Sequence, residues 1–151
     1  MTKALFFDID GTLVSFETHA IPASTIEALT IAHEKGIKIF IATGRPKAII
    51  NNLTDIQDRG LIDGYITMNG AYCFVGDEVI YKSAIPAGEV RALAKVCEQK
   101  GYPCIFVGEH TISVCQPNKL VHDIFYDFLH VDEIPVKTFE EAVQEEIFQM
   151  T

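Results

Sequence analysis

The sequence predicts an α/β fold that begins as a Rossmann-like parallel sheet. Over the first 70 residues, short apolar runs alternate with helix-like segments in the order βαβαβ, a pattern typical of parallel strands joined by right-handed crossovers. Turn dipeptides then replace the helical segments, and an α+β region follows. We therefore expect two domains, a sheet core over 1–82 and an inserted α+β domain over 83–151.

The first strand is expected over residues 4–8, because a continuous apolar run suits a parallel strand that is buried on both faces. Ser24 and Glu27 have the spacing of a capping box, which predicts a helix that begins after Ser24. Gly36 is expected to end this helix. A second buried strand is predicted directly afterwards, over residues 37–42.

Proline and glycine residues predict the remaining elements of the first domain. Pro46 suits the first turn of another helix, and a third short strand is expected over 65–68. The turn dipeptides Asn69-Gly70 and Gly76-Asp77 lie between apolar runs. They favour antiparallel hairpins through residue 82.

The second region alternates helical and extended patterns, and it contains no repeat. Its first helix is expected to point Val90, Leu93, Ala94 and Cys97 inward and to stop at Gly101. The expected elements are a helix over 86–100, strands over 103–108 and 111–116, a helix over 117–130, one or two helical turns over 138–143, and a strand over 145–150.

Composition excludes several classes of function. The chain has 151 residues, 48% of them hydrophobic, and a net charge of -9 without a Lys/Arg cluster, so a nucleic-acid partner is not expected. No apolar run approaches the ~18 residues of a membrane span. The four cysteines form no Cys-x-x-Cys pair, and the chain starts without a leader pattern. We therefore expect reduced thiols in a cytoplasmic protein.

The segment Asp8-Ile9-Asp10-Gly11-Thr12 follows the first apolar run directly. In an extended chain, residues i and i+2 point to the same side, so Asp8 and Asp10 are expected to share one site. Two like charges in one site repel unless a divalent metal or a substrate compensates them. The alternative interpretation is an Asx turn, which explains one Asp and the Gly but not both carboxylates.

Polar residues from three strands are expected to meet at one edge of the sheet, because ligands of open α/β sheets lie outside the carboxyl ends of the strands. Thr43 either binds a phosphate oxygen or caps the following helix. Arg45 is either a surface charge or a substrate contact. Asn69 is either a turn residue or a substrate neighbour. Backbone N–H groups around Gly11 and Gly44 can add donors to a phosphate.

This constellation suits phosphoryl transfer. A carboxylate nucleophile splits the reaction into two easier steps by forming an acyl-phosphate. A second carboxylate can give a proton to the leaving oxygen and later take one from water. Mg²⁺ would bridge the carboxylate and the phosphate and offset their repulsion.

The start Asp8-Ile9-Asp10-Gly11-Thr12-Leu13 and the segment Ala42-Thr43-Gly44-Arg45-Pro46 resemble the haloacid dehalogenase-like hydrolase superfamily. The hairpin at Met68-Asn69-Gly70-Ala71 and the α+β insertion resemble its Cof-type, sugar-phosphatase-like branch, in which the second domain is a cap that closes over the site and selects the leaving group. The resemblance runs over essentially the whole chain.

The resemblance implies a role for each matching residue. Asp8 would be the phosphoryl-accepting nucleophile and Asp10 the general acid/base. Asp8 and the backbone carbonyl of Asp10 would ligate Mg²⁺, while Thr43 would bind the transferring phosphoryl group. The full set of expected phosphate- and substrate-binding residues is Gly11, Thr12, Thr43, Gly44, Arg45 and Asn69.

Two family features are not found in this sequence: a later Lys that neutralises the nucleophile and phosphate, and a later motif of the type Gly-Asp-x-x-Asn-Asp that completes the metal site. Gly76-Asp77 is the one Gly-Asp pair, and it lies in the wrong place. Two explanations compete. Either the chain is the N-terminal part of a longer phosphatase, which we prefer, or it is a short protein that kept the fold's start and lost catalysis.

The predicted function is a Mg²⁺-dependent phosphatase that hydrolyses small phosphorylated metabolites through an aspartyl-phosphate. The 151-residue chain alone is expected to be a weak catalyst. One alternative is a phosphomutase of the same superfamily, and the other is a catalytically dead module that binds phosphate or metal. The sequence carries no signal for the substrate or the oligomeric state.

Overall fold

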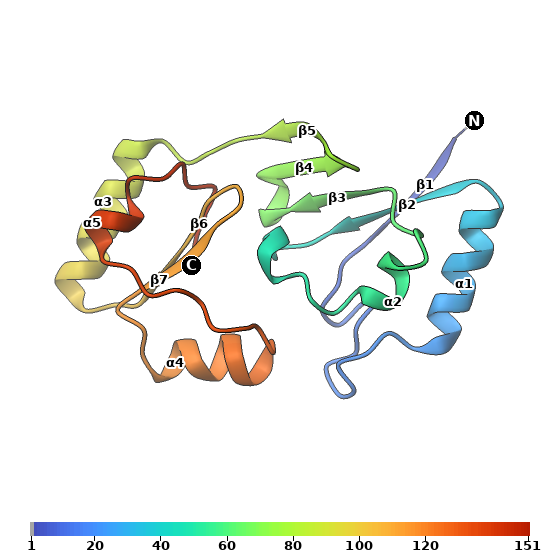
Figure 1. The fold of residues 1–151 in the computed structure, drawn as a ribbon, viewed down its shortest axis with the longest axis horizontal. Helices are drawn as coiled ribbons and strands as arrows, with labels where there is room; N and C mark the ends of the chain where they lie inside the picture. Colours follow the sequence, from blue (N-terminus) through green and yellow to red (C-terminus); the bar gives the residue numbers. More distant parts are fainter. Residues whose placement is uncertain (1) are drawn as a thin grey trace. The chain divides into compact units, whose positions relative to one another are not determined.

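The computed structural model describes residues 2–151, which divide into two compact units. The first unit holds the chain up to Pro46 together with Ile50–Lys82, and the second holds Lys47–Ile49 together with Ser83–Thr151. Each unit has its own sheet (Figure 1). Each also has its own apolar core.

The first unit is built on a five-stranded sheet in the order β1-β2-β3-β4-β5. β1 pairs with β2 and β2 with β3 in parallel, whereas β3 pairs with β4 and β4 with β5 antiparallel. This mixed sheet confirms the predicted α/β class. The elements up to the end of this sheet are β1 (Lys3–Phe7), α1 (Ala23–Glu34), β2 (Ile37–Ala42), η1 (Lys47–Ile49), α2 (Thr54–Gln57), β3 (Gly64–Thr67), η2 (Met68–Gly70), β4 (Tyr72–Val75) and β5 (Glu78–Lys82).

The core of this unit lies between the sheet and the helices α1 and α2. Ile39 and Ile41 of β2 are fully buried and pack with Leu29 of α1. Because side chains alternate along a strand, the intervening Phe40 faces the opposite side. There it stacks on Phe6, which is its register partner in β1, with ring centroids 5.0 Å apart.

The expectation that the first strand is buried on both faces is wrong. Leu5 is 40% exposed and Phe6 is 57% exposed. β1 is an edge strand of the sheet as the described residues form it, so no strand covers its outer side. An apolar run of this kind therefore identified a strand without identifying its place in the sheet.

The predicted capping box at Ser24 is also wrong. The helix α1 begins at Ala23, with Pro22 as its N-cap and no side-chain cap. The Pro22 carbonyl accepts hydrogen bonds from the N–H groups of Thr25 and Ile26, so the fixed φ of proline starts the helix before Ser24. The predicted stop is confirmed, since Gly36 follows the last turn with φ +75°.

The second unit contains a three-stranded antiparallel sheet in the order β7-β6-β8. Val90 and Ala94 of its long helix pack on Phe106 of the central strand in one apolar core. The elements of the remaining chain are α3 (Ala87–Lys100), β6 (Cys104–Val107), β7 (Ile112–Cys115), α4 (Lys119–Val121), η3 (His122–Phe128), α5 (Phe139–Ala142) and β8 (Gln149–Met150).

Several expectations in the second unit need correction. Leu93 was expected to point inward, but it is 50% exposed. The helix expected over 117–130 begins after Asn118, whose side chain caps it, and continues as the π-helix η3. The last strand comprises only Gln149 and Met150. The predicted stop at Gly101 is confirmed by its left-handed φ of +68°.

The four cysteines are free, and Cys104 and Cys115 are buried. Burial, together with the neighbouring Cys97, raises the pKa of Cys104 to about 12. Burial, with Glu141 nearby, raises the pKa of Cys115 to about 11. A thiol attacks as the thiolate, so these groups are poor candidates for covalent chemistry. Among residues 2–151, no helix has the length and apolar character needed to cross a bilayer.

Candidate active site

The candidate active site lies in the first unit, where β1, β2 and β3 end. These strands run parallel, so their carboxyl ends share one edge of the sheet, the usual ligand-binding edge of an open α/β sheet. Asp8 and Asp10 follow β1, the segment Thr43-Gly44-Arg45 follows β2, and Asn69 follows β3. The topology therefore brings three predicted segments to one edge.

The loop after β1 is anchored by the residue between the two carboxylates. Ile9 is fully buried, and its carbonyl accepts hydrogen bonds from the N–H groups of Leu13 (3.0 Å) and Val14 (2.9 Å). With Ile9 held in the core, Asp8 is left exposed and Asp10 is partly exposed, with 27% of its side chain accessible. The loop thus leaves both carboxylates accessible, while their sharing of one site stays a prediction.

The shape of this loop requires glycine at position 11, and the N–H of Gly11 is not open to a ligand. Its φ is +78°, and a Cβ at this position would lie 2.6 Å from Cε2 of Phe16. Its N–H donates to the Val14 carbonyl at 2.9 Å, and the Thr12 N–H donates to the Ile9 carbonyl at 3.2 Å. Both amides predicted to help bind phosphate are therefore already used within the loop.

Asp8 and Gly44 offer open polar groups. Within residues 2–151, neither the Asp8 carboxylate nor the Gly44 N–H takes part in a hydrogen bond. An exposed carboxylate without a protein partner is available to a cation or an electrophile. An open amide can donate to an anion.

Arg45 makes the closest contact between two of the predicted segments. Its Nε donates to Oδ2 of Asp10 and its Nη2 donates to Oδ1, each at 2.8 Å. This is the bidentate geometry in which arginine binds carboxylates most strongly. Arg45 is only 7% exposed, so the interpretation of a surface charge is wrong. The residue belongs to the site, and its observed partner there is Asp10.

Thr43 holds the start of its own loop. Its Oγ1 accepts a hydrogen bond from the Arg45 N–H at 3.1 Å, and the residue is 6% exposed. This contact spans two residues and does not cap a helix, so the capping alternative is wrong. Since a hydroxyl has one donor and two acceptor positions, the Thr43 O–H remains able to donate to an anion.

Asn69 and Met68 tie the third segment to the second. The Asn69 N–H donates to the Thr43 carbonyl at 3.2 Å, and the Met68 N–H donates to the Arg45 carbonyl at 3.3 Å. Asn69 has φ +55°, a turn conformation that asparagine tolerates. A Cβ on Gly44 would lie 3.1 Å from Oδ1 of Asn69, so the side chain of Asn69 lies against this glycine.

The oxygen atoms of Asp8 and Asp10 at this edge are of the type that suits a hard cation. The carboxylate of Asp8 and the backbone carbonyl of Asp10 are oxygen ligands, and Mg²⁺ binds through one or two carboxylates while keeping several waters. As far as residues 2–151 show, the Asp8 carboxylate has no hydrogen bond to lose on metal binding. The donor set therefore fits the predicted Mg²⁺.

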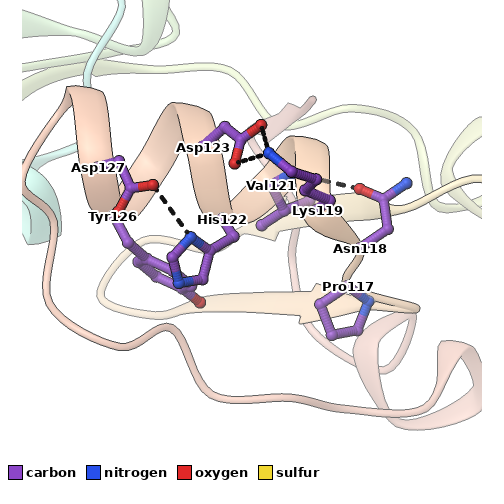
Figure 2. A pocket seen from close by; sticks show the side chains of 8 residues that line it. All are labelled: Pro117, Asn118, Lys119, Val121, His122, Asp123, Tyr126 and Asp127. Atoms are coloured by element: carbon purple, nitrogen blue, oxygen red, sulfur yellow. Dashed lines mark hydrogen bonds and ion pairs between the residues drawn. The ribbon is translucent and has the colours of Figure 1, made fainter.

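A second polar cluster lies in the other unit and was not predicted. A groove of about 600 Å³ is lined by residues of α4 and η3 (Figure 2). Nδ1 of His122 lies 3.3 Å from Oδ2 of Asp127. One ligand atom from each of His122, Asp123 and Asp127 lies within 4.8 Å of the others.

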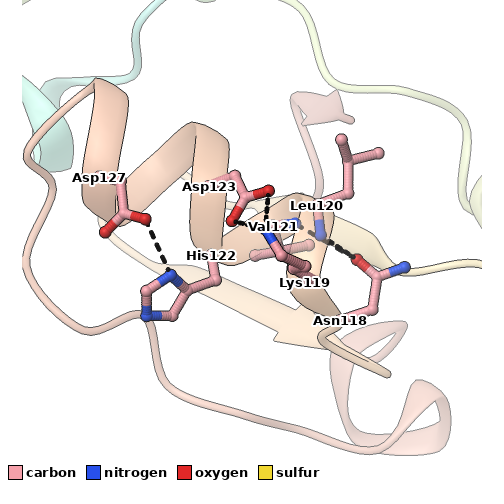
Figure 3. A network of polar contacts seen from close by, with 7 residues as sticks. All are labelled: Asn118, Lys119, Leu120, Val121, His122, Asp123 and Asp127. Carbon is pink, nitrogen blue, oxygen red and sulfur yellow. Dashed lines mark hydrogen bonds and ion pairs between the residues drawn. The ribbon is translucent and has the colours of Figure 1, made fainter.

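The π-helix explains why sequence spacing missed this cluster. In an α-helix of 3.6 residues per turn, residues five positions apart point to different sides, whereas the i→i+5 bonding of a π-helix brings them together. The Leu129 N–H donates to the Ile124 carbonyl in this pattern. Lys119 holds both oxygens of Asp123, at 2.6 and 2.7 Å (Figure 3), so one carboxylate of the cluster is already paired with a cation.

A parallel sheet with two carboxylates at its carboxyl edge places the chain among α/β proteins that bind their ligands at this edge. A sequence model of the haloacid dehalogenase-like hydrolases matches residues 5–151. The chain therefore belongs to the haloacid dehalogenase-like hydrolase family, which confirms the resemblance found in the sequence.

Known proteins extend this relationship. YkrA of Bacillus subtilis (strain 168) is 32% identical over 111 residues, which cover 74% of this chain and 42% of YkrA. The solved structure of BT4131, a sugar phosphatase of HAD subclass IIB, is 76% identical with a TM-score of 0.94, over 99% of this chain and 57% of that one. BT1666 from Bacteroides thetaiotaomicron is 37% identical with a TM-score of 0.77, over 97% and 54%. The chain thus spans about half the length of these relatives.

Proposed function

We propose that this chain carries the nucleophile and the general acid/base of a Mg²⁺-dependent phosphatase. One observation supports this proposal above the others: the Asp8 carboxylate is exposed and has no partner among residues 2–151, while Asp10, two residues away, is held by Arg45. A free carboxylate suits attack, and a fixed carboxyl group suits directed proton transfer.

The proposed reaction has two steps. In the first, a carboxylate oxygen of Asp8 attacks phosphorus, the bond from phosphorus to the leaving oxygen breaks, and Asp10 gives that oxygen its proton. In the second, Asp10 takes a proton from water as the water oxygen attacks the aspartyl-phosphate. The Asp8 carboxylate is regenerated and inorganic phosphate leaves.

The groups around Asp8 have distinct proposed tasks. The Thr43 hydroxyl and the Gly44 N–H donate hydrogen bonds to the phosphoryl oxygens. Asp8 and the Asp10 carbonyl hold Mg²⁺, which would neutralise charge on the phosphoryl group. Asn69, which lies against Gly44, contributes to the substrate side of the site. Residues 83–151 serve as the cap domain.

We propose sugar phosphates and similar small phosphate esters as the substrate class. The sequence is 76% identical to a protein described as a sugar phosphatase over almost all of this chain. That similarity supports a shared class of leaving group. It also favours hydrolysis over the phosphomutase alternative.

The test is phosphate release by the full-length protein as its source encodes it. We expect inorganic phosphate to appear from a panel of hexose, pentose and glycerol phosphates with Mg²⁺, and the release to stop with EDTA and to resume with excess Mg²⁺. An isomerised sugar phosphate in place of free phosphate would indicate the mutase. Binding of the ester without turnover would indicate a regulatory module.

A further inference from the structure

We infer that Arg45 is a positioning residue for Asp10 and does not bind the substrate. This inference rests on the proposed function, in which Asp10 transfers the proton. It assigns Arg45 to the leaving-group step of the reaction. The hydrogen bonds of the guanidinium and those of the Arg45 backbone support this role.

At least three of the five N–H groups of the guanidinium donate to protein oxygens. Nε and Nη2 hold the two oxygens of Asp10, each at 2.8 Å, and Nη1 donates to Oδ1 of Asn51 at 3.3 Å. Arg45 is 7% exposed, whereas 27% of the Asp10 side chain is accessible. The buried member of the pair is thus the arginine, and the accessible member is the carboxyl group that would meet the substrate.

The backbone of Arg45 is fixed on both sides of its Cα. Its N–H donates to Thr43 Oγ1 at 3.1 Å, and its carbonyl accepts from the Met68 N–H at 3.3 Å. The loops after β2 and β3 therefore hold the arginine before any substrate arrives. The planar guanidinium of an arginine held in this way loses less rotamer freedom for each hydrogen bond than the flexible side chain of a lysine would.

Two parallel hydrogen bonds fix the plane of the Asp10 carboxyl group as well as its position. A carboxylate has about four lone-pair sites, so two bonds from Arg45 leave a site on each oxygen for the transferred proton. Misplacing a reacting group by about 1 Å costs roughly 10²-fold in rate. Loss of the two hydrogen bonds from Arg45 is therefore expected to slow proton transfer from Asp10 to the leaving oxygen. Phosphate binding should be retained.

The leaving group gives a direct test in the full-length protein. The alkoxide of a sugar phosphate needs a proton as it leaves, whereas the nitrophenolate of p-nitrophenyl phosphate leaves without one. The ratio kcat/KM reports only the steps up to release of the alcohol, so hydrolysis of the aspartyl-phosphate does not enter. We expect Arg45→Lys to lower kcat/KM for the sugar phosphate by roughly 10²-fold, the scale of general acid catalysis, and for p-nitrophenyl phosphate by less than about tenfold.

Four further variants separate positioning from folding and from binding. Asp10→Asn should give the same leaving-group pattern, and the double variant with Arg45→Lys should be no slower than Asp10→Asn alone, because both remove one function. Guanidinium ion at a non-denaturing concentration should restore Arg45→Ala in part. Arg59→Lys changes an exposed arginine and should leave both substrates unaffected.

The outcomes distinguish the two proposals. Equal losses for both substrates in Arg45→Lys, or additive losses in the double variant, would overturn the positioning role and favour substrate binding. Wild-type protein that releases no phosphate from either ester would overturn the proposed function and the inference with it. A larger loss of kcat/KM for the sugar phosphate than for p-nitrophenyl phosphate, seen in both Arg45→Lys and Asp10→Asn, supports the proposed function and the positioning role.

Discussion

The side chain of Thr43 accepts a hydrogen bond from the backbone N–H of Arg45 at 3.1 Å, and both residues are at least nine-tenths buried. Thr43→Val keeps the shape of the side chain but leaves this N–H without its partner. We expect a loss of about 1–3 kcal/mol in the free energy of unfolding, the cost of an unsatisfied buried donor. Chemical denaturation measures it.

Thr43→Ser is the matched control, because it keeps the hydroxyl. We expect Thr43→Ser to retain most of the stability and most of the phosphatase activity, and Thr43→Val to lose both. Equal stabilities for the two variants would show that the hydrogen bond contributes nothing measurable.

The second prediction concerns the nucleophile. Asp8→Asn should abolish phosphate release by the full-length protein, since an amide oxygen is too weak a nucleophile to form the acyl-phosphate. Its stability should stay close to wild type, because the Asp8 carboxylate makes no hydrogen bond within residues 2–151. Phosphate release checks the loss of activity, and thermal unfolding checks the unchanged stability. Retained turnover would refute the assignment of Asp8 as the nucleophile. Asp77→Asn, in an exposed turn, is the control.

The third prediction concerns the packing of β3. A Cβ on Gly64 would lie 2.8 Å from Val75 Cγ2 and 2.9 Å from both Phe40 Cε1 and the Phe74 carbonyl oxygen. Gly64→Ala should therefore destabilise the protein by about 1–3 kcal/mol, as overpacking does. Gly88 in α3 has no heavy atom within 4 Å of such a Cβ, so Gly88→Ala should be neutral or stabilising by up to about 1 kcal/mol. Urea unfolding compares the two, and similar losses would contradict the packing argument.

The fourth prediction concerns acid stability. Burial by itself would raise the pKa of Asp63, but hydrogen bonds from Lys38 Nζ (2.6 Å) and the Ile39 N–H (2.9 Å), together with the charges of Lys38 and His33, outweigh it and hold the pKa below its ordinary value. A lowered pKa in the folded state stabilises the protein above the unfolded value of about 3.9. This stabilisation is lost as the pH falls through the folded pKa.

Asp63→Asn tests this directly. The difference in unfolding free energy between wild type and Asp63→Asn should be constant near neutral pH and should shrink as the pH falls below about 4. Asp55→Asn changes an exposed carboxylate and should show no such trend. A difference that is independent of pH down to about 2 would contradict the role of ionised Asp63.

Much of the candidate site was predictable because its signals are local. The apolar run before Asp8 and the run before Thr43 marked two strands, and the order of elements implied that these strands are parallel. Parallel strands present their carboxyl ends at one edge, so Asp8, Asp10, Thr43 and Asn69 were expected together. The positions of these residues in the structure agree with that expectation, while their chemical roles stay predictions.

Other features depend on residues far apart in the sequence. The pairing of Asp10 with Arg45 joins positions 35 apart, and no local pattern distinguishes an arginine that binds a carboxylate from one in solvent. The exposure of Leu5 and Phe6 follows from the place of β1 at a sheet edge. The proximity of His122 to Asp127 follows from a π-helical backbone, which the usual 3.6-residue period does not predict.

The amino-acid sequence was therefore enough to predict the α/β class, the order of strands and helices up to β5, and the edge of the sheet where the chemistry is expected. These follow from periodicity, turn residues and strand direction, which act over a few neighbouring residues, while the family followed from the resemblance of two motifs to known hydrolases. The partners of the charged side chains, the amides already used and the covered apolar faces became known only from the folded chain. Those properties are set by contacts between distant segments, because burial and hydrogen bonding depend on what the folded chain places beside each group.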